Sequence, residues 1–162
     1  MSEDAEKIDP ILAQSAHIRT GHPPPAINVI VVGAGGTGGR LVPPLMQILK
    51  QGDSVAIVDG DHVEDRNLVR QNFRVRDIGE NKAEVLARRY RREGIEMSAF
   101  ASMLSAATYP HFIRPGLNVI LGCVDNPLAR REMLAATEAN NATLYIDGGN
   151  EMRGGQVLLS AR

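Results

Sequence analysis

A glycine-rich segment near the start of the chain has the composition of a nucleotide-binding turn. It reads GAGGTG and directly follows the β-branched run INVIVV, which predicts a strand buried on both faces. Glycines permit a tight turn and a close approach of the backbone to a phosphate, while the first N–H groups of a following helix attract negative charge. The segment therefore predicts a nucleotide site, without saying which nucleotide, on Gly33, Gly35, Gly36 and Gly38.

An acidic residue follows at the end of the second predicted strand. Asp59 lies 21 residues beyond Gly38, where a carboxylate is placed to accept hydrogen bonds from ribose hydroxyls. The alternative is a solvated turn aspartate in the segment Asp59-Gly60-Asp61. Up to this point, an NAD-dependent oxidoreductase fits the pattern as well as an ATP-binding protein does.

The next polar residues favour a triphosphate. Asn67, Arg70 and Lys82 fall within 16 residues, just past the carboxyl end of that strand, at the rim where open α/β sheets bind ligands. A dinucleotide held at a helix end needs no further cations. A triphosphate whose pyrophosphate must leave does need them, because negative charge develops on the leaving group. Each residue alone would more often be a surface side chain, but together they indicate ATP.

The elements that must position these residues alternate along the chain. A helix is expected from the glycine turn to about Leu49, and Pro43-Pro44 should kink it or end it early. A weakly helical stretch is expected near 102–112. The alternation predicts an α/β, Rossmann-like, mostly parallel sheet with helices on both faces. Further strands are expected at 54–60, 95–100, 117–123, 143–147 and 155–161, and further helices at 81–93 and 127–140.

Four motifs, in this order and spacing, resemble the ThiF/MoeB/ubiquitin-activating family. They are GxGGxG at 33–38, DxDxVxxxNLxRQ at 59–71, DIGxxK at 77–82, and Cys123-Val124-Asp125-Asn126 followed by Arg130. The resemblance covers roughly residues 27–150. The segment 148–159 is also similar to bacterial PRTRC-associated ThiF-like proteins. Members of the family adenylate the C-terminal glycine of a ubiquitin-like or sulfur-carrier protein, and dimers are usual among them.

The resemblance implies a role for each matching residue. The glycines shape the ATP pocket, Asp59 binds the ribose with Asp61 beside it, and Gln71 supports the loop that carries the phosphate-binding residues Asn67, Arg70 and Lys82. Asp125 holds Mg²⁺, which favours one or two carboxylates plus phosphate oxygens, and Asn126 lines the adenine and α-phosphate side. The alternative for Asp125-Asn126-Pro127 is a helix cap, and both roles can hold at once. The residues with a direct part in the reaction are then Arg70, Lys82 and Asp125.

The implied reaction is in-line attack by the carrier's carboxylate on the α-phosphorus of ATP, which gives an acyl-adenylate and pyrophosphate. Catalysis comes mainly from positioning and charge neutralisation, so this step needs no side-chain nucleophile. Non-catalytic nucleotide binding, for regulation or assembly, remains an alternative function.

The sequence departs from the family pattern in several places. Its one cysteine, Cys123, lies in an apolar run and is predicted to be a core residue rather than a nucleophile. The CxxC pairs of a zinc site are absent, as is the "RQ" element before the first strand, where Arg19 is the only arginine. The chain stops at Arg162, so we expect a truncated domain or a second subunit that supplies the rest.

Composition excludes several other classes. With 18 basic and 19 acidic residues the net charge is −1, so nothing global steers the protein to nucleic acid or to a membrane surface. The arginines at 88, 89, 91 and 92 are interpreted as a solvated helix end. The acidic opening residues resemble no signal peptide, and no apolar run reaches the roughly 18 residues of a membrane span. We therefore expect a cytoplasmic domain at 27–162 behind a polar, proline-terminated leader at 1–26.

Overall fold

The computed structural model describes residues 25–105, 107–138, 143–151 and 154–161, so nearly all of the predicted leader lies outside the described residues. Six strands form one sheet: β1 (Ile27–Val32), β2 (Ser54–Val58), β3 (Glu96–Phe100), β4 (Leu117–Gly122), β5 (Thr143–Glu151) and β6 (Gly154–Ala161). The α-helices are α2 (Gly36–Ile48), α3 (Lys82–Tyr90) and α4 (Pro127–Glu138), and the short 3-10 helices are η1 (Asp65–Asn67), η2 (Val75–Asp77) and η3 (Tyr109–His111).

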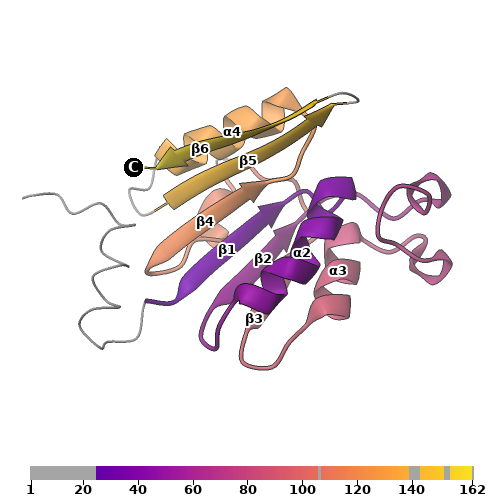
Figure 1. The fold of residues 1–162 in the computed structure, drawn as a ribbon, viewed down its shortest axis with the longest axis horizontal. Helices are drawn as coiled ribbons and strands as arrows, with labels where there is room; N and C mark the ends of the chain where they lie inside the picture. The colour runs from indigo at the N-terminus through magenta and orange to yellow at the C-terminus, as the bar shows by residue number, and fades with distance from the viewer. Residues whose placement is uncertain (1–24, 106, 139–142, 152–153, 162) are drawn as a thin grey trace, which may run out of the picture.

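The sheet has the order β3-β2-β1-β4-β5-β6 (Figure 1). Its first five strands are parallel, and β6 pairs antiparallel with β5. The chain therefore leaves β1 toward one edge and returns to add β4 on its other side, which creates a crevice at the carboxyl ends of β1 and β4. The predicted α/β, mostly parallel architecture is confirmed.

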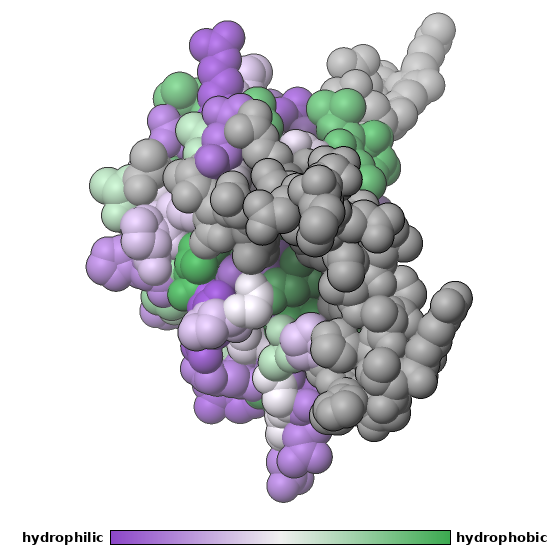
Figure 2. All heavy atoms as spheres, turned by 90° about the vertical axis from the view of Figure 1, so that its left-hand side faces the viewer, coloured by the Kyte–Doolittle hydropathy of each residue, from purple (hydrophilic) through white to green (hydrophobic). Residues whose placement is uncertain are grey.

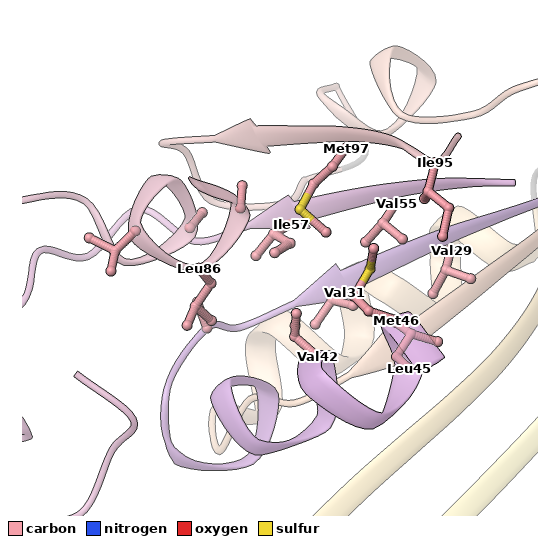
Figure 3. Close-up of a cluster of buried hydrophobic side chains, with 14 of the residues drawn as sticks. Val29, Val31, Val42, Leu45, Met46, Val55, Ile57, Leu86, Ile95 and Met97 are labelled. Atoms are coloured by element: carbon pink, nitrogen blue, oxygen red, sulfur yellow. The ribbon is translucent and has the colours of Figure 1, made fainter. Parts of the chain in front are cut away.

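The two faces of the sheet carry separate cores. On one face Val31 and Ile57, both fully buried, pack with α2 and α3 (Figure 3). On the other, Ile30 and Ile120 pack with residues of η3 and α4, including Met133. Burying one such side chain contributes about 1.5–3 kcal/mol, which fixes the strand register and with it the place of every strand-end residue. The prediction of strands buried on both faces and of helices on both faces is correct.

The first helix differs from expectation, because it does not end early. α2 continues through Pro43 and Pro44 to Ile48. Pro43 has no N–H for the carbonyl of Gly39, four residues before it. The side chain of Asn72 donates from Nδ2 to that carbonyl at 3.4 Å. A neighbouring loop therefore replaces the bond that the proline removes, and the helix persists.

The stretch near 102–112 is also less helical than expected. Among the residues of this stretch that the structure describes, the three of η3 are helical and the others are not. The backbone N–H of Ser105 donates to Thr108 Oγ1 at 2.9 Å, and the N–H of Thr108 donates to Ser105 Oγ at 3.2 Å. Such local side-chain bonds offer the backbone an alternative to the helical ladder, which explains the error.

The arginine-rich end of α3 is engaged in contacts within the fold. Arg88 pairs with Glu80 at 2.6 Å, and Arg89 pairs with the buried Asp77. The pKa of Asp77 is pushed upward by burial, but the Arg74 N–H and Arg89 outweigh that and hold it below its usual value.

Figure 2 shows the end of the molecule away from the carboxyl rim, where hydrophilic residues are prominent on the described surface. None of the helices within the described ranges is long and apolar enough to cross a membrane.

Candidate functional site

The glycine turn is fixed by close backbone contacts. Gly33 has a φ of +95°, and its N–H donates to the carbonyl of Val58 at 2.9 Å. A Cβ at Gly38 would lie 1.9 Å from the carbonyl oxygen of Gly33. Both positions therefore require glycine, because a side chain at Gly38 would force α2 away from the end of β1, and one at Gly33 would clash with the carbonyl of Cys123.

Gly35 and Gly36, at the start of α2, lie beside the segment 67–71 without crowding, since a Cβ at either would make only ordinary van der Waals contacts. The nearest atom to a Cβ at Gly36 would be the carbonyl oxygen of Arg70, at 3.9 Å, and at Gly35 it would be Gln71 Nε2, at 3.7 Å. The Ncap residue of α2 is Gly35, no side chain caps the helix, and its first turn contains no acidic residue. The N–H groups at this end are thus available to an anion.

Gln71 contributes an unpaired polar atom to the same place. Its Oε1 is buried and has no hydrogen-bond partner among the described residues. Buried polar atoms are usually paired, so this amide oxygen is an acceptor available to a hydrogen-bond donor beside the glycine turn. The backbone carbonyl of Asn67 accepts the N–H groups of Arg70 and Gln71, so the segment 67–71 is folded into a turn, whose last residues lie beside Gly35 and Gly36.

Asn67 and Arg70 differ in whether their side chains are buried and already bonded to the protein. Asn67 is buried, and its Oδ1 accepts the N–H of Glu64 at 2.8 Å, so this side chain braces η1. Arg70 is exposed, and its guanidinium makes no ion pair or hydrogen bond with any residue that the structure describes. Of the two, Arg70 is the group that remains available for a phosphate.

Asp59 links the second strand to the glycine turn. One carboxylate oxygen accepts the N–H of Ala34 at 2.6 Å, and the other accepts the N–H of Asp61 at 2.8 Å. Each oxygen keeps a second lone pair for a hydroxyl donor. The carboxylate is therefore held in place at the rim, beside the turn, as a ribose-binding residue requires.

Lys82 lies against Asp61. Its Nζ is 2.9 Å from Asp61 Oδ2, and the lysine side chain is 9% exposed while that of Asp61 is 57% exposed. An ammonium group has three donors, so this pair leaves two of them free. The structure thus brings the lysine of the third motif to the aspartates of the second.

Asn81 is a site residue that sequence reasoning missed. Its Oδ1 accepts the N–H groups of Ala83 and Glu84 and so caps α3, while its Nδ2 donates to the carbonyls of Asp59 and Asp61 at 2.8 and 3.0 Å. One side chain therefore fixes Lys82 relative to the acidic turn. The signal in the sequence is an asparagine directly before a predicted helix.

Asp125 and Asn126 follow β4 at the same rim. Asn126 Oδ1 accepts the N–H of Leu128 at 2.8 Å, so the helix-cap alternative describes its contact in the structure. Asp125 is exposed, and no hydrogen bond or ion pair of its side chain occurs among the described residues. The turn packs against the glycine turn, since a Cβ at Gly33 would lie 2.8 Å from the carbonyl oxygen of Cys123.

Cys123 is not in the state of a nucleophile. Burial and then the nearby charge of Asp147 raise the pKa of its thiol to about 12. A thiolate is therefore essentially absent at neutral pH. This agrees with the sequence prediction of a core residue.

The rim can be tested for magnesium by its donors. Asp125 offers a free carboxylate, a ligand type that Mg²⁺ prefers. Within the described ranges, no group of three or more histidine, cysteine, aspartate or glutamate side chains is gathered as a metal site. The donor set fits a metal held by one carboxylate and completed by phosphate and water oxygens.

A family model and individual proteins are similar to this chain. The ThiF family model matches residues 26–160. The NEDD8-activating enzyme E1 catalytic subunit of Arabidopsis thaliana is 36% identical over 91 residues, which are 54% of this chain and 17% of the plant protein.

Solved structures from E. coli share the fold. The tRNA N6-threonylcarbamoyladenosine dehydratase TcdA aligns with a TM-score of 0.65 and 21% identity over 78% of this chain and 54% of its own. MccB crystallised with ATP aligns with a TM-score of 0.61 and 26% identity over 76% and 37%. MccB crystallised with AMPCPP and MccA aligns with a TM-score of 0.67 and 21% identity over 99% and 51%. The chain therefore spans less than two thirds of each of these proteins.

Proposed function

The chain belongs to the ThiF family, and on that premise we propose that it binds ATP and adenylates the C-terminal glycine carboxylate of a ubiquitin-like or sulfur-carrier protein. One observation carries the proposal. The glycine turn, Asp59 and the segment 67–71 meet at one rim, which has uncapped N–H groups at the start of α2, the buried Gln71 Oε1 without a partner among the described residues, and the exposed Arg70 in that segment.

The relatives support this choice. MccB has been crystallised with ATP, and also with AMPCPP together with MccA. The plant relative is named as an enzyme that activates NEDD8. The chain spans only part of each relative. That it acts without a further subunit is therefore part of the proposal.

The chain's own residues would act by holding charge. The N–H groups at the start of α2 and the guanidinium of Arg70 would bind phosphate oxygens. The ammonium of Lys82 would donate one of its hydrogen bonds to the leaving pyrophosphate in place of Asp61. Asp59 accepts from the ribose hydroxyls. Asn67 and Gln71 keep the segment 67–71 against the glycine turn, while Asn126 borders the adenine and α-phosphate side.

Asp125 is the residue that would hold Mg²⁺. When bound, the ion neutralises phosphate charge and orients the α-phosphorus. The chain supplies one exposed carboxylate, on the turn that follows β4 and packs against Gly33, so Asp125 would hold the ion beside the glycine turn. We do not retain the NAD-dependent oxidoreductase as an alternative. The chain matches the ThiF family, and a dinucleotide site would leave the cations Arg70 and Lys82 without a role.

We also propose a homodimer in the cytoplasm as the working form, following the family resemblance. Sedimentation of the full chain tests the oligomer directly. A single species with twice the chain mass is expected, and a monomer at all concentrations would contradict it.

A second candidate is a non-catalytic nucleotide-binding module. It is favoured by Cys123, whose pKa near 12 leaves no thiolate for a later thioester step. It predicts ATP binding at the same rim without any chemistry at the α-phosphorus.

Exchange of labelled pyrophosphate into ATP separates the two candidates. The full chain, Mg²⁺ and a glycine-terminated ubiquitin-like protein should give exchange, and Arg70→Ala should lower it by about 100-fold or more. Arg74→Ala, an exposed arginine of the same projecting loop, is the matched control and should change little. ATP binding without exchange, across sulfur-carrier and ubiquitin-like partners, would favour the module instead.

A further inference from the structure

A buried ion pair lies beside the proposed nucleotide site, and neither of its residues has a role in the function proposed above. Asp147, in β5, is 1% exposed, and its Oδ2 lies 2.9 Å from Nε of Arg130, in α4. In the register of the sheet Asp147 is the neighbour of Gly122, the last residue of β4. The pair therefore sits directly below the turn 123–126.

The sheet leaves room for this carboxylate. A Cβ at Gly122 would lie 2.7 Å from Asp147 Oδ1 and 3.1 Å from Met133 Cε. Glycine at position 122 thus opens the space that the aspartate occupies. Burial, followed by the charge of Asp147, raises the pKa of the neighbouring Tyr145 to about 12, so Tyr145 stays neutral and adds no charge to the pair.

Arg130 connects the pair to the turn. Its Nη2 donates to the carbonyl of Val124 at 3.1 Å, and its backbone N–H donates to the carbonyl of Asn126 at 3.2 Å. Val124 in turn touches the glycine turn, because a Cβ at Gly33 would lie 3.0 Å from Val124 Cγ1. A continuous set of contacts thus runs from Asp147 through Arg130 and Val124 to Gly33.

We propose that Asp147 is a positioning residue, which through Arg130 holds the turn 123–126, and with it Asp125 and Asn126, against the glycine turn. The inference rests on the proposed function, since nucleotide binding is what the positioning serves. A buried ion pair stabilises a fold no more than a well-packed apolar pair would. Its contribution here is charge attraction, which keeps the guanidinium of Arg130 beside the turn, where its Nη2 donates to the carbonyl of Val124.

Two measurements test the proposal separately from the proposed function. Amide hydrogen exchange of the peptide covering 122–128 reports the turn without any nucleotide. Asp147→Asn and Arg130→Gln should each raise its exchange rate by about 10-fold or more, and the double variant should add little, because both act through one contact. Asp53→Asn is the matched control, since Asp53 is also buried but accepts the N–H groups of Ile27 and Lys50 at the opposite end of the sheet.

Titration with Mg-ATP, well below the unfolding temperature of every variant, is the second measurement. The Kd should rise roughly 10-fold in Asp147→Asn and Arg130→Gln, the scale of a displaced binding group, and less than twofold in Asp53→Asn. If all three variants lose stability but keep both the wild-type exchange at 122–128 and the wild-type Kd, the role is only structural and the proposal is overturned. If the wild-type chain binds no ATP, the proposed function fails, and unchanged exchange at 122–128 would still overturn the positioning role.

Discussion

Two cation–carboxylate pairs of equal length lie at the carboxyl rim of the sheet, and their burial is reversed. Lys82 and Asp61 are 2.9 Å apart, with the lysine 9% exposed and the aspartate 57% exposed. Arg130 and Asp147 are also 2.9 Å apart, but the aspartate is 1% exposed and the arginine 28%. In the first pair the anion faces solvent, and in the second it is enclosed.

The difference teaches which pair can exchange partners. An exposed carboxylate is solvated when its cation leaves, so Lys82 can turn to a phosphate at little cost. A buried carboxylate that loses its cation remains as an uncompensated charge, which is strongly unfavourable. The first pair is therefore suited to binding and release, and the second to holding a turn in one position.

The largest expected effect concerns the thiol next to the enclosed pair. With a pKa of about 12 in place of an ordinary value near 8.5, the thiolate of Cys123 at pH 8.5 is about a thousandfold scarcer. Alkylation by iodoacetamide should therefore be slower than in the urea-unfolded chain by about that factor. Equal rates in the two states would show that the surroundings of Cys123 and Asp147 are as accessible to solvent as those of the Lys82–Asp61 pair.

The next effect tests the exchangeable pair. Lys82→Met should lower pyrophosphate exchange by about 100-fold or more, because the developing charge loses a donor. Lys50→Met is the matched control, since Lys50 is exposed and lies at the far end of α2. Equal activity of the two variants would mean that Lys82 only pairs with Asp61.

A third effect compares the two pairs by stability, with the cation removed from each. Arg130→Gln should lower the free energy of unfolding by about 3 kcal/mol, because it leaves the buried carboxylate of Asp147 uncompensated. Lys82→Met should lower it by less than about 1 kcal/mol, because the exposed carboxylate of Asp61 remains solvated. Urea titration of both variants measures the contrast, and equal losses would remove the distinction between the pairs.

The smallest effect uses a third pair, away from the rim. Burial pushes the pKa of Asp77 upward, but the Arg74 N–H and Arg89 favour the charged form and hold the pKa below the ordinary aspartate value. Its contribution is therefore fully present above about pH 4 and is lost as the pH falls through the folded-state pKa. Asp77→Asn should be less stable than wild type at pH 6, and the difference should shrink at pH 3 in urea titrations. A constant difference would mean that the carboxylate's charge is not what stabilises this pair.

The sequence predicts the fold well because its signals are local. The β-branched runs and the glycine turn identify β1, β2 and the crevice beside β1. Continuation of α2 through Pro43 was not predictable, since the replacement bond comes from Asn72, which is distant in sequence. Within the rim, the motifs point to Asp59, Arg70 and Lys82, whereas Asp147 escaped notice because only the pairing of β4 with β5 brings it below the turn 123–126.

The most direct test of the account is a crystal structure of the full chain with Mg²⁺ and a non-hydrolysable ATP analogue. The account predicts Arg70 and Lys82 within hydrogen-bond distance, about 3 Å, of phosphate oxygens at the start of α2. It would be contradicted if the nucleotide were bound there with both side chains far from every phosphate oxygen.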